Sequence, residues 1–349
     1  MAKLQVVDRK LWAALLPQCQ AAQLSVACLQ KVPLHFARSR HGLRASEVSV
    51  ARLRFALMRL WSAQAAERMA SFSARDLADL AWSAARLREA FLLRSLAPQA
   101  LRRCVELTAP ELSKTAWAFA SCGLQPTELF EALAKEGAQR VEDFTPQGLS
   151  NVIWAFGTLA RRDLKLQRLV AQQVEKMLPE FNAQNLANTA WGFAKLMYKR
   201  EELYSSIASE AEKKLSSFQP QNVSNTLWAL AKVRHDDDVF FVAASSYAMK
   251  LNEFSIQAAV NCVWAMAEVS YYDPEVFQAV AEDALRRREE FKPQDLSNLI
   301  WSFATVLHED EELLHGVARA AQAAIQSLEC QHLACVAWSF ALLQESMRQ

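Results

Sequence analysis

A sixteen-residue pattern of apolar and polar positions recurs along most of the chain, and its clearest copy is FQPQNVSNTLWALAKV at Phe218 to Val233. Its tryptophan marks each copy, and successive tryptophans are separated by 35, 37, 37, 37, 36, 37 and 37 residues. They are Trp82, Trp117, Trp154, Trp191, Trp228, Trp264, Trp301 and Trp338. A fixed period of this length is typical of stacked supersecondary units, so we expect a repeat protein.

Each copy of the repeat predicts two helices joined by a polar turn. The first helix begins after an apolar residue ten positions before the tryptophan and runs for about thirteen residues. Thr145 before Pro146 is a typical start, because a hydroxyl can cap a free backbone amide and proline is tolerated at the first helical position. The second helix is amphipathic. In one repeat Leu203 and Ile207 belong to its apolar face, and Glu210 to its predicted wet face.

Two antiparallel helices of this length cannot bury their apolar faces alone, so neighbouring repeats must stack. Only seven glycines and ten prolines interrupt the 349 residues, which favours helix throughout. The pattern therefore predicts an all-α protein, a right-handed α-solenoid of about eight 37-residue helix-turn-helix repeats. We expect the repeat domain over residues 71–349, with an incomplete last repeat.

Residues 1–70 match the repeat poorly and predict a helical cap or a targeting region. No acidic residue lies between Asp8 and Glu47, which is compatible with an organellar presequence. Val48 to Met58 resembles a degenerate first repeat, and terminal units of solenoids are often atypical.

On a helical wheel, the first helix of each repeat separates into an apolar face and a polar column. Counted from the tryptophan, positions −5, −2, −1, +2 and +5 are apolar and predict the core. Positions −7, −3, 0 and +4 share the other side, and we call them the polar column. Glutamine recurs at −7, asparagine at −3 and varied residues at +4. The candidate ligand-binding residues are Gln147, Asn151, Thr158, Gln184, Asn188, Lys195, Gln221, Asn225, Lys232, Gln257, Asn261, Gln294, Asn298 and Thr305.

The chemistry of the polar column suits single-stranded RNA. Amides donate and accept hydrogen bonds at base edges, an indole can stack on a base, and one varied side chain per repeat could tune selection along the strand. A structural interpretation stays open beside this one. The tryptophans could wedge between neighbouring repeats, and the amides could form a ladder that satisfies buried backbone groups.

The overall charge counts mildly against nucleic acid, because lysine and arginine exceed aspartate and glutamate by only one. A local basic stripe remains compatible with this balance. The alternative function is a protein-binding α-solenoid scaffold that holds an extended peptide or partner.

Sequence motifs give no support for an enzyme, since the chain has no glycine-rich phosphate loop, no HExxH and no serine in a nucleophile elbow. CQHLAC at Cys330 to Cys335 lacks the second ligand pair of a zinc site, so we expect no metal and no cofactor. The seven cysteines form no paired framework and are expected to be small core residues. The longest apolar run is too short for membrane insertion, and the oligomeric state stays open.

The unit F-x-P-Q-x-L-S-N-x-x-W-A-F-A-x-L, in phase from Phe72 to Leu343, resembles the heptatricopeptide repeats of organellar proteins. These are relatives of the octotricopeptide repeats and of the FAST kinase-like family. The resemblance implies a solenoid that binds single-stranded organellar RNA in mitochondria or chloroplasts. It also implies a role in RNA processing, mRNA stability, rRNA processing or translation. Many such proteins carry a C-terminal RAP domain, which we do not expect here because only eleven residues follow Trp338.

Overall fold

The computed structural model describes residues 69–235, 237–248 and 253–346, and these residues form fifteen α-helices, several short 3-10 helices and no strand. Residues 1–68 of the predicted cap or targeting region, with the degenerate repeat at Val48 to Met58, lie outside the described residues. The chain divides into two compact units, of which the first ends at Leu169 and the second begins at Val170. Each unit is considered by itself.

Each repeat contains a first helix, here the A helix, and a second, here the B helix. The first unit contains α4 (Ala74–Leu87), α5 (Ala90–Arg102), α6 (Ala109–Ser121), α7 (Thr127–Gln139) and α8 (Pro146–Thr158). Helix α9 (Leu164–Met177) spans the division between the units. The second unit contains α10 (Ala183–Lys195), α11 (Glu201–Lys213), α12 (Pro220–Val233), α13 (Asp238–Ala248), α14 (Ile256–Glu268), α15 (Pro274–Arg286), α16 (Pro293–Thr305), α17 (Glu311–Ala323) and α18 (Cys330–Ser346).

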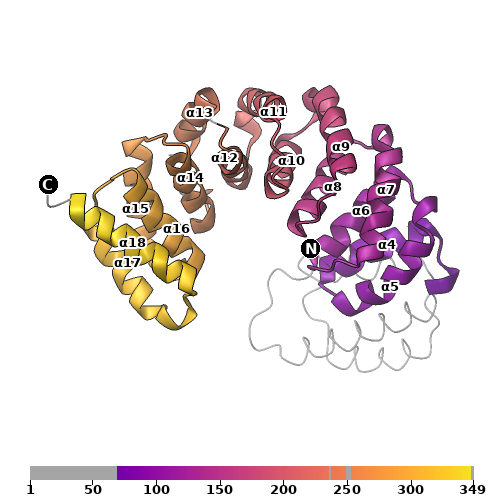
Figure 1. The fold of residues 1–349 in the computed structure, drawn as a ribbon, viewed down its shortest axis with the longest axis horizontal. Coiled ribbons are helices and arrows are strands. Elements are labelled where there is room, and N and C mark those ends of the chain that lie inside the picture. The colour runs from indigo at the N-terminus through magenta and orange to yellow at the C-terminus, as the bar shows by residue number, and fades with distance from the viewer. Residues whose placement is uncertain (1–68, 236, 249–252, 347–349) are drawn as a thin grey trace, which may run out of the picture. The chain divides into compact units, whose positions relative to one another are not determined.

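Within each unit the A helices pack directly against one another, and the B helices α5, α7, α11, α13, α15 and α17 each pack on the A helix of their own repeat. Helices α4, α6 and α8 form such a layer in the first unit, and α10, α12, α14, α16 and α18 form one in the second (Figure 1). Position +3 is a small residue that is buried from α4 to α16, as at Ala194, Ala231 and Ala267, which lets neighbouring A helices approach closely. The described part of the chain is therefore a helical repeat solenoid, as the repeat predicted.

The predicted apolar face forms the core. In α12, Val223, Leu227 and Leu230 are fully buried, and the aromatic residue Phe218 before the helix is buried as well. Burying each such side chain stabilises the fold by about 1.5–3 kcal/mol relative to its exposure. The stacking of repeats thus accounts for the regular apolar positions.

Side chains cap the A-helix starts, as predicted for Thr145. Its Oγ1 accepts a hydrogen bond from the Gly148 amide at 3.2 Å. In α10 the cap is reciprocal, because Asn182 accepts from the Asn185 amide at 2.9 Å and Asn185 accepts from the Asn182 amide at 3.4 Å. These contacts satisfy amides that would otherwise lack a partner at the helix start.

A residue with positive φ ends each A helix from α4 to α16. In α12, Arg234 has φ of 59°, its amide donates to the Ala231 carbonyl, and the His235 amide donates to the Leu230 carbonyl. This pair of bonds is a Schellman motif. Glycine stands at this position once, at Gly123. The remaining positions are Arg88, Ala160, Met197, Arg234, Ser270 and Leu307.

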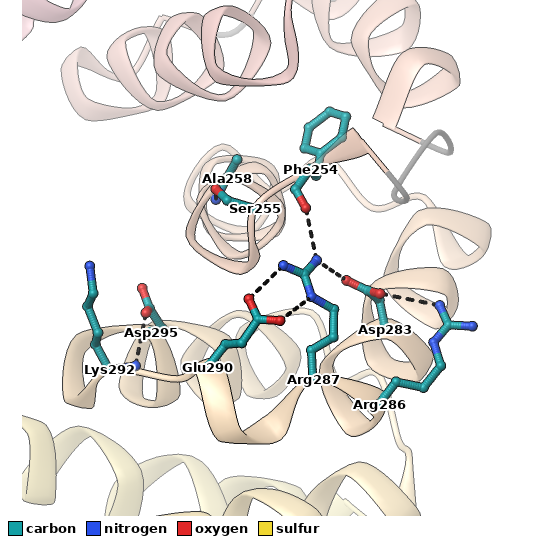
Figure 2. Close-up of polar contacts among 9 residues, drawn as sticks. All are labelled: Phe254, Ser255, Ala258, Asp283, Arg286, Arg287, Glu290, Lys292 and Asp295. Atoms are coloured by element: carbon teal, nitrogen blue, oxygen red, sulfur yellow. Dashed lines mark hydrogen bonds and ion pairs between the residues drawn. The ribbon is translucent and has the colours of Figure 1, made fainter. Parts of the chain in front are cut away.

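A basic residue at the end of a B helix forms hydrogen bonds with the backbone at the start of the same repeat. Arg287 Nη1 donates to the Phe254 carbonyl at 2.9 Å and to Asp283 at 3.0 Å (Figure 2). Its Nε and Nη2 donate to the two carboxylate oxygens of Glu290 at 3.0 and 2.8 Å. The hydrogen bonds with Glu290, supported by the charge of Asp283, raise the pKa of the Arg287 guanidinium. One guanidinium therefore links three points of the repeat.

A basic residue at the end of α11 makes equivalent contacts, and these explain why the predicted exposure of Glu210 is wrong. Glu210, predicted on the wet face of α11, is buried and pairs with Lys214 at 2.8 Å and Lys213 at 3.1 Å. The hydrogen bond from Lys214, followed by that from Lys213, lowers the pKa of the Glu210 carboxyl despite its burial. Lys214 also donates to the carbonyls of Pro179 and Phe181 at 2.7 Å each. Glu210 therefore orients a lysine that joins the ends of the repeat.

Candidate nucleic-acid interface

The polar column lies on the side of the A helices that faces solvent. Its side chains are exposed to different degrees at its different positions. The glutamines at −7 are exposed, whereas the asparagines at −3 and seven of the eight tryptophans are half-buried. Trp338 on α18 is 50% exposed. Exposed glutamines are Gln147, Gln184, Gln221, Gln257, Gln294 and Gln331, and half-buried asparagines are Asn151, Asn188, Asn225, Asn261 and Asn298. The predicted column is thus accessible to a ligand along both units.

The tryptophans form a ladder between successive A helices. In the second unit, the ring centroids of Trp191, Trp228, Trp264 and Trp301 are 6.2 Å apart at each step, with planes tilted by 28–36°. In the first unit, Trp117 and Trp154 are 6.4 Å apart. A base cannot enter between indoles that already contact each other. The ladder therefore supports the interpretation of these tryptophans as inter-repeat packing.

The amides at −7 and −3 pair within a helix. Gln221 Nε2 donates to Asn225 Oδ1 at 2.9 Å, and Gln294 Nε2 donates to Asn298 Oδ1 at 2.7 Å. Each pair leaves the Asn Nδ2 group as a donor, and the first pair also leaves the Gln221 Oε1 atom as an acceptor. This combination matches the donors and acceptors on the edge of an unpaired base.

The ladder of amides between repeats, the second structural interpretation, does not describe these contacts. Across the described part of the chain, the side chains of Asn151, Asn188 and Asn261 have no hydrogen-bond partner. Gln294 does contact the following repeat, through His332 Nε2 at 3.2 Å. The amide atoms of these three asparagines remain in contact with solvent, so they are available to a ligand.

The polar column begins differently in the first two repeats. Asp79 and Lys114 both occupy position −3, and Lys114 Nζ contacts Asp79 Oδ1 at 2.9 Å. Neither residue is among the candidates from the sequence, although their 35-residue separation equals the first tryptophan spacing. The ion pair takes the place that amides occupy from Asn151 onward.

Position +4 concentrates positive charge on two neighbouring A helices. Lys195 on α10 and Lys232 on α12 are exposed. The Lys195 ammonium lies 5.5 Å from the Trp191 ring centroid and 5.3 Å from that of Trp228, within the range of a cation–π interaction. The next repeat has Glu268 at +4, which lies 3.7 Å from Arg234. The exposed cations of the column in the second unit are therefore confined to α10 and α12.

The remaining +4 candidates are polar. Thr158 and Thr305 are both exposed, and Thr305 Oγ1 donates to the Trp301 carbonyl at 2.8 Å. In the first repeat, the guanidinium of Arg86 lies 5.2 Å from the Trp82 ring centroid. The variation at +4 thus changes charge from one repeat to the next while the tryptophan stays the same.

Within residues 69–346, as far as they are described, no group of three or more His, Cys, Asp or Glu side chains could hold a metal ion. His332 accepts from the Glu329 amide at 3.2 Å through Nδ1 and acts as part of a helix start.

Cys330, expected in the core, is exposed, whereas Cys104 and Cys262 are buried. None of the described helices is long and apolar enough to cross a membrane.

The fold and this surface define a helical repeat protein with one accessible polar column on its A helices. A family model described as RNA-editing substrate-binding complex 6 protein matches residues 47–201 and, a second time, residues 202–348, so the chain belongs to this family. Each match contains four of the eight tryptophans that mark the repeats. No curated protein matches the chain. The family confirms an RNA-associated repeat protein, and it does not confirm the closer resemblance to heptatricopeptide repeats or the FAST kinase-like group.

Proposed function

We propose that this chain binds single-stranded RNA along the polar column and acts as a substrate-binding component in RNA editing or related RNA processing. The observation that carries the proposal is the row of half-buried asparagines, most without a protein partner, each one turn from an exposed glutamine. Membership of a family described by an RNA-editing substrate-binding complex supports RNA as the ligand. It also favours the mitochondrion and gives no support to the chloroplast.

In this proposal, each repeat presents one set of side chains to one nucleotide. Asparagine at −3 and glutamine at −7 would bind the base edge, as two or three side chains do in other one-base-per-repeat proteins. The residue at +4 would change the preference from repeat to repeat. The tryptophan would set the spacing between A helices. The chain would contribute binding and no catalytic step.

Fluorescence anisotropy with the purified chain tests this function. We expect saturable binding to a single-stranded RNA and weaker binding to a duplex of the same sequence. The double variant Asn188→Ala with Asn225→Ala should weaken binding about tenfold or more, since each lost hydrogen bond contributes roughly 0.5–1.5 kcal/mol. Gln278→Ala, an exposed amide on the B helix α15, is the matched control and should leave binding unchanged.

Two outcomes would contradict the proposal. One is the lack of saturable RNA binding by the wild-type chain. The other is an equal effect of the α10–α12 amide variants and the Gln278→Ala control. Recovery of a protein partner that survives nuclease treatment, with no RNA affinity, would instead favour the peptide-binding scaffold.

A further inference from the structure

Lys195 and Lys232 have no ion pair among the described side chains, whereas Lys114 on α6 and Arg234 after α12 do. Both are exposed, and both stand at +4 on helices that pack side by side. The cation–π contacts of Lys195 with Trp191 and Trp228 hold its aliphatic chain along the ladder. Two adjacent ammonium groups therefore border the polar column at the C-terminal ends of α10 and α12.

At the opposite ends of the A helices, Lys292 before α16 is exposed, whereas Lys214 near the start of α10 and Arg287 near the start of α14 have partners inside their repeats. Arg287 is held by Glu290, Asp283 and the Phe254 carbonyl, as Figure 2 shows. Lys214 is held by Glu210 and two carbonyls. Because these cations already have partners inside the repeat, they are poorly placed to neutralise phosphates.

Backbone amides at the A-helix starts, which often bind anions, are also occupied. In α10 Asn182 caps the Asn185 amide, and in α14 Ser255 caps the Ala258 amide. At the start of α16 the Asp295 carboxylate accepts from the Lys292 amide at 3.1 Å (Figure 2). A phosphate approaching this side would meet capped amides and, at α16, the Asp295 carboxylate beside the exposed Lys292.

We infer that RNA crosses the second unit with its phosphates on Lys195 and Lys232 and its bases directed toward Asn188 and Asn225. The inference rests on the proposed function and adds the orientation of the strand across the column. Positions +4 and −3 are separated by seven residues, or about 10 Å along a helix. A nucleotide bridges this separation from phosphate to base edge, and the indole lies beneath it. Glu268 at the equivalent position of α14 ends the phosphate contacts, although the amides continue on α14 and α16.

The experiment compares two double variants on two probes of equal charge. The probes are a 12-nucleotide RNA and a 12-unit abasic ribose-phosphate strand, each titrated over a range of salt concentrations. Lys195→Gln with Lys232→Gln should weaken binding to both probes about 10- to 30-fold at 0.1 M salt and reduce the salt slope by about 1.4, since each phosphate contact on a single strand contributes about 0.7. Asn188→Ala with Asn225→Ala should weaken binding only to the RNA, with an unchanged slope.

Matched controls keep the result interpretable. Lys176→Gln with Arg319→Gln removes the same charge from exposed positions of the B helices α9 and α17 and should barely change the slope. Glu268→Lys should raise the slope by about 0.7 and tighten binding, because it extends the row of cations. This gain does not depend on removing any side chain from the proposed site.

The outcomes separate the inference from the function on which it rests. If the wild-type chain does not bind RNA, the proposed function fails, and the inference fails with it. If the chain binds but the lysine and control variants reduce the slope equally, the strand orientation alone is wrong. A loss of abasic-strand binding in the asparagine variant would likewise overturn it, because it would place phosphates on the amides.

Discussion

The indole rings of Trp228 and Trp264 lie 6.2 Å apart between centroids, with their planes 28° from parallel. Trp264 makes a similar contact with Trp301 on its other side, so it joins three consecutive A helices. Offset aromatic contacts of this kind add about 0.5–1.5 kcal/mol to the free energy gained by burial. The tryptophan that identifies the repeat in the sequence is thus a contact between repeats.

Replacing Trp264 should therefore destabilise the second unit. We expect Trp264→Ala to lower the free energy of unfolding by about 3 kcal/mol, near the lower end for tryptophan truncation because the ring is half-buried. Urea denaturation followed by circular dichroism measures the loss. Trp338→Ala is the matched control, because the Trp338 ring on α18 is 50% exposed. This substitution should lower the free energy of unfolding clearly less. Equal losses in the two variants would show that the ladder contributes little.

Replacing Arg287 tests the contacts that its guanidinium makes within the repeat. Arg287→Ala leaves Asp283, which is only 4% exposed, without its closest counter-charge, and leaves the Phe254 carbonyl without its guanidinium donor. We expect a loss of about 3 kcal/mol in the free energy of unfolding, as for the breaking of a buried pair. Arg286→Ala removes an exposed partner of Asp283 and should cost below about 1 kcal/mol. A similar cost for both variants in urea titrations would contradict the special role of Arg287.

Periodicity in the sequence predicted the helices and the direction of each face well, because both depend on residues within one repeat. The predicted cap of Thr145 is confirmed, and the glutamines and asparagines of the column occupy one exposed side. Their role in binding RNA stays a prediction. A helical wheel gives the direction of a side chain from its own axis, so local pattern was sufficient for these features.

Contacts between repeats were harder to predict, because they depend on partners about 35 residues away. The wheel placed Glu210 in water, yet Lys214 neutralises it while reaching the carbonyls of Pro179 and Phe181. The pairing of Lys114 with Asp79 was missed for the same reason. Comparison of the charge at each repeat position with that in the next repeat would have revealed the pairing of Lys114 with Asp79.

Helix ends were the other feature that the sequence concealed, since glycine, the usual residue at positive φ, stands there only at Gly123. At the equivalent position Ala160 has φ of 51° and an exposed side chain. A residue with a Cβ atom is strained by about 1 kcal/mol in this conformation. We expect Ala160→Gly to raise the free energy of unfolding by about 0.5–1 kcal/mol in urea denaturation.

Gly123→Ala provides the reverse substitution in the same unit. A Cβ atom at Gly123 would meet no heavy atom within 4 Å, so its cost comes from the backbone conformation and not from a clash. We expect a loss of about 1 kcal/mol. Opposite signs for the two variants would support the conformational explanation, and a destabilised Ala160→Gly protein would refute it.

His308 connects the turn after α16 to neighbouring aromatic residues. Its Nδ1 lies 2.8 Å from the Tyr272 hydroxyl, and its ring centroid is 5.1 Å from that of Phe303. Burial lowers the pKa of His308 below its ordinary value of 6.5, and the charge of Asp310 opposes this shift only in part. Between the folded and unfolded pKa values, the unfolded chain binds the additional proton.

The contribution of His308 to stability is therefore fully present above pH 6.5 and decreases as the pH falls below that value toward the folded-state pKa. We expect the urea midpoint of the wild-type chain to fall more between pH 7.5 and pH 5.5 than that of His308→Gln, which keeps an acceptor for Tyr272 but does not titrate. His315→Gln, on the exposed side of α17, should retain the wild-type dependence. If His308→Gln and the wild-type chain lose stability equally on acidification, the buried imidazole is not the source of this pH dependence.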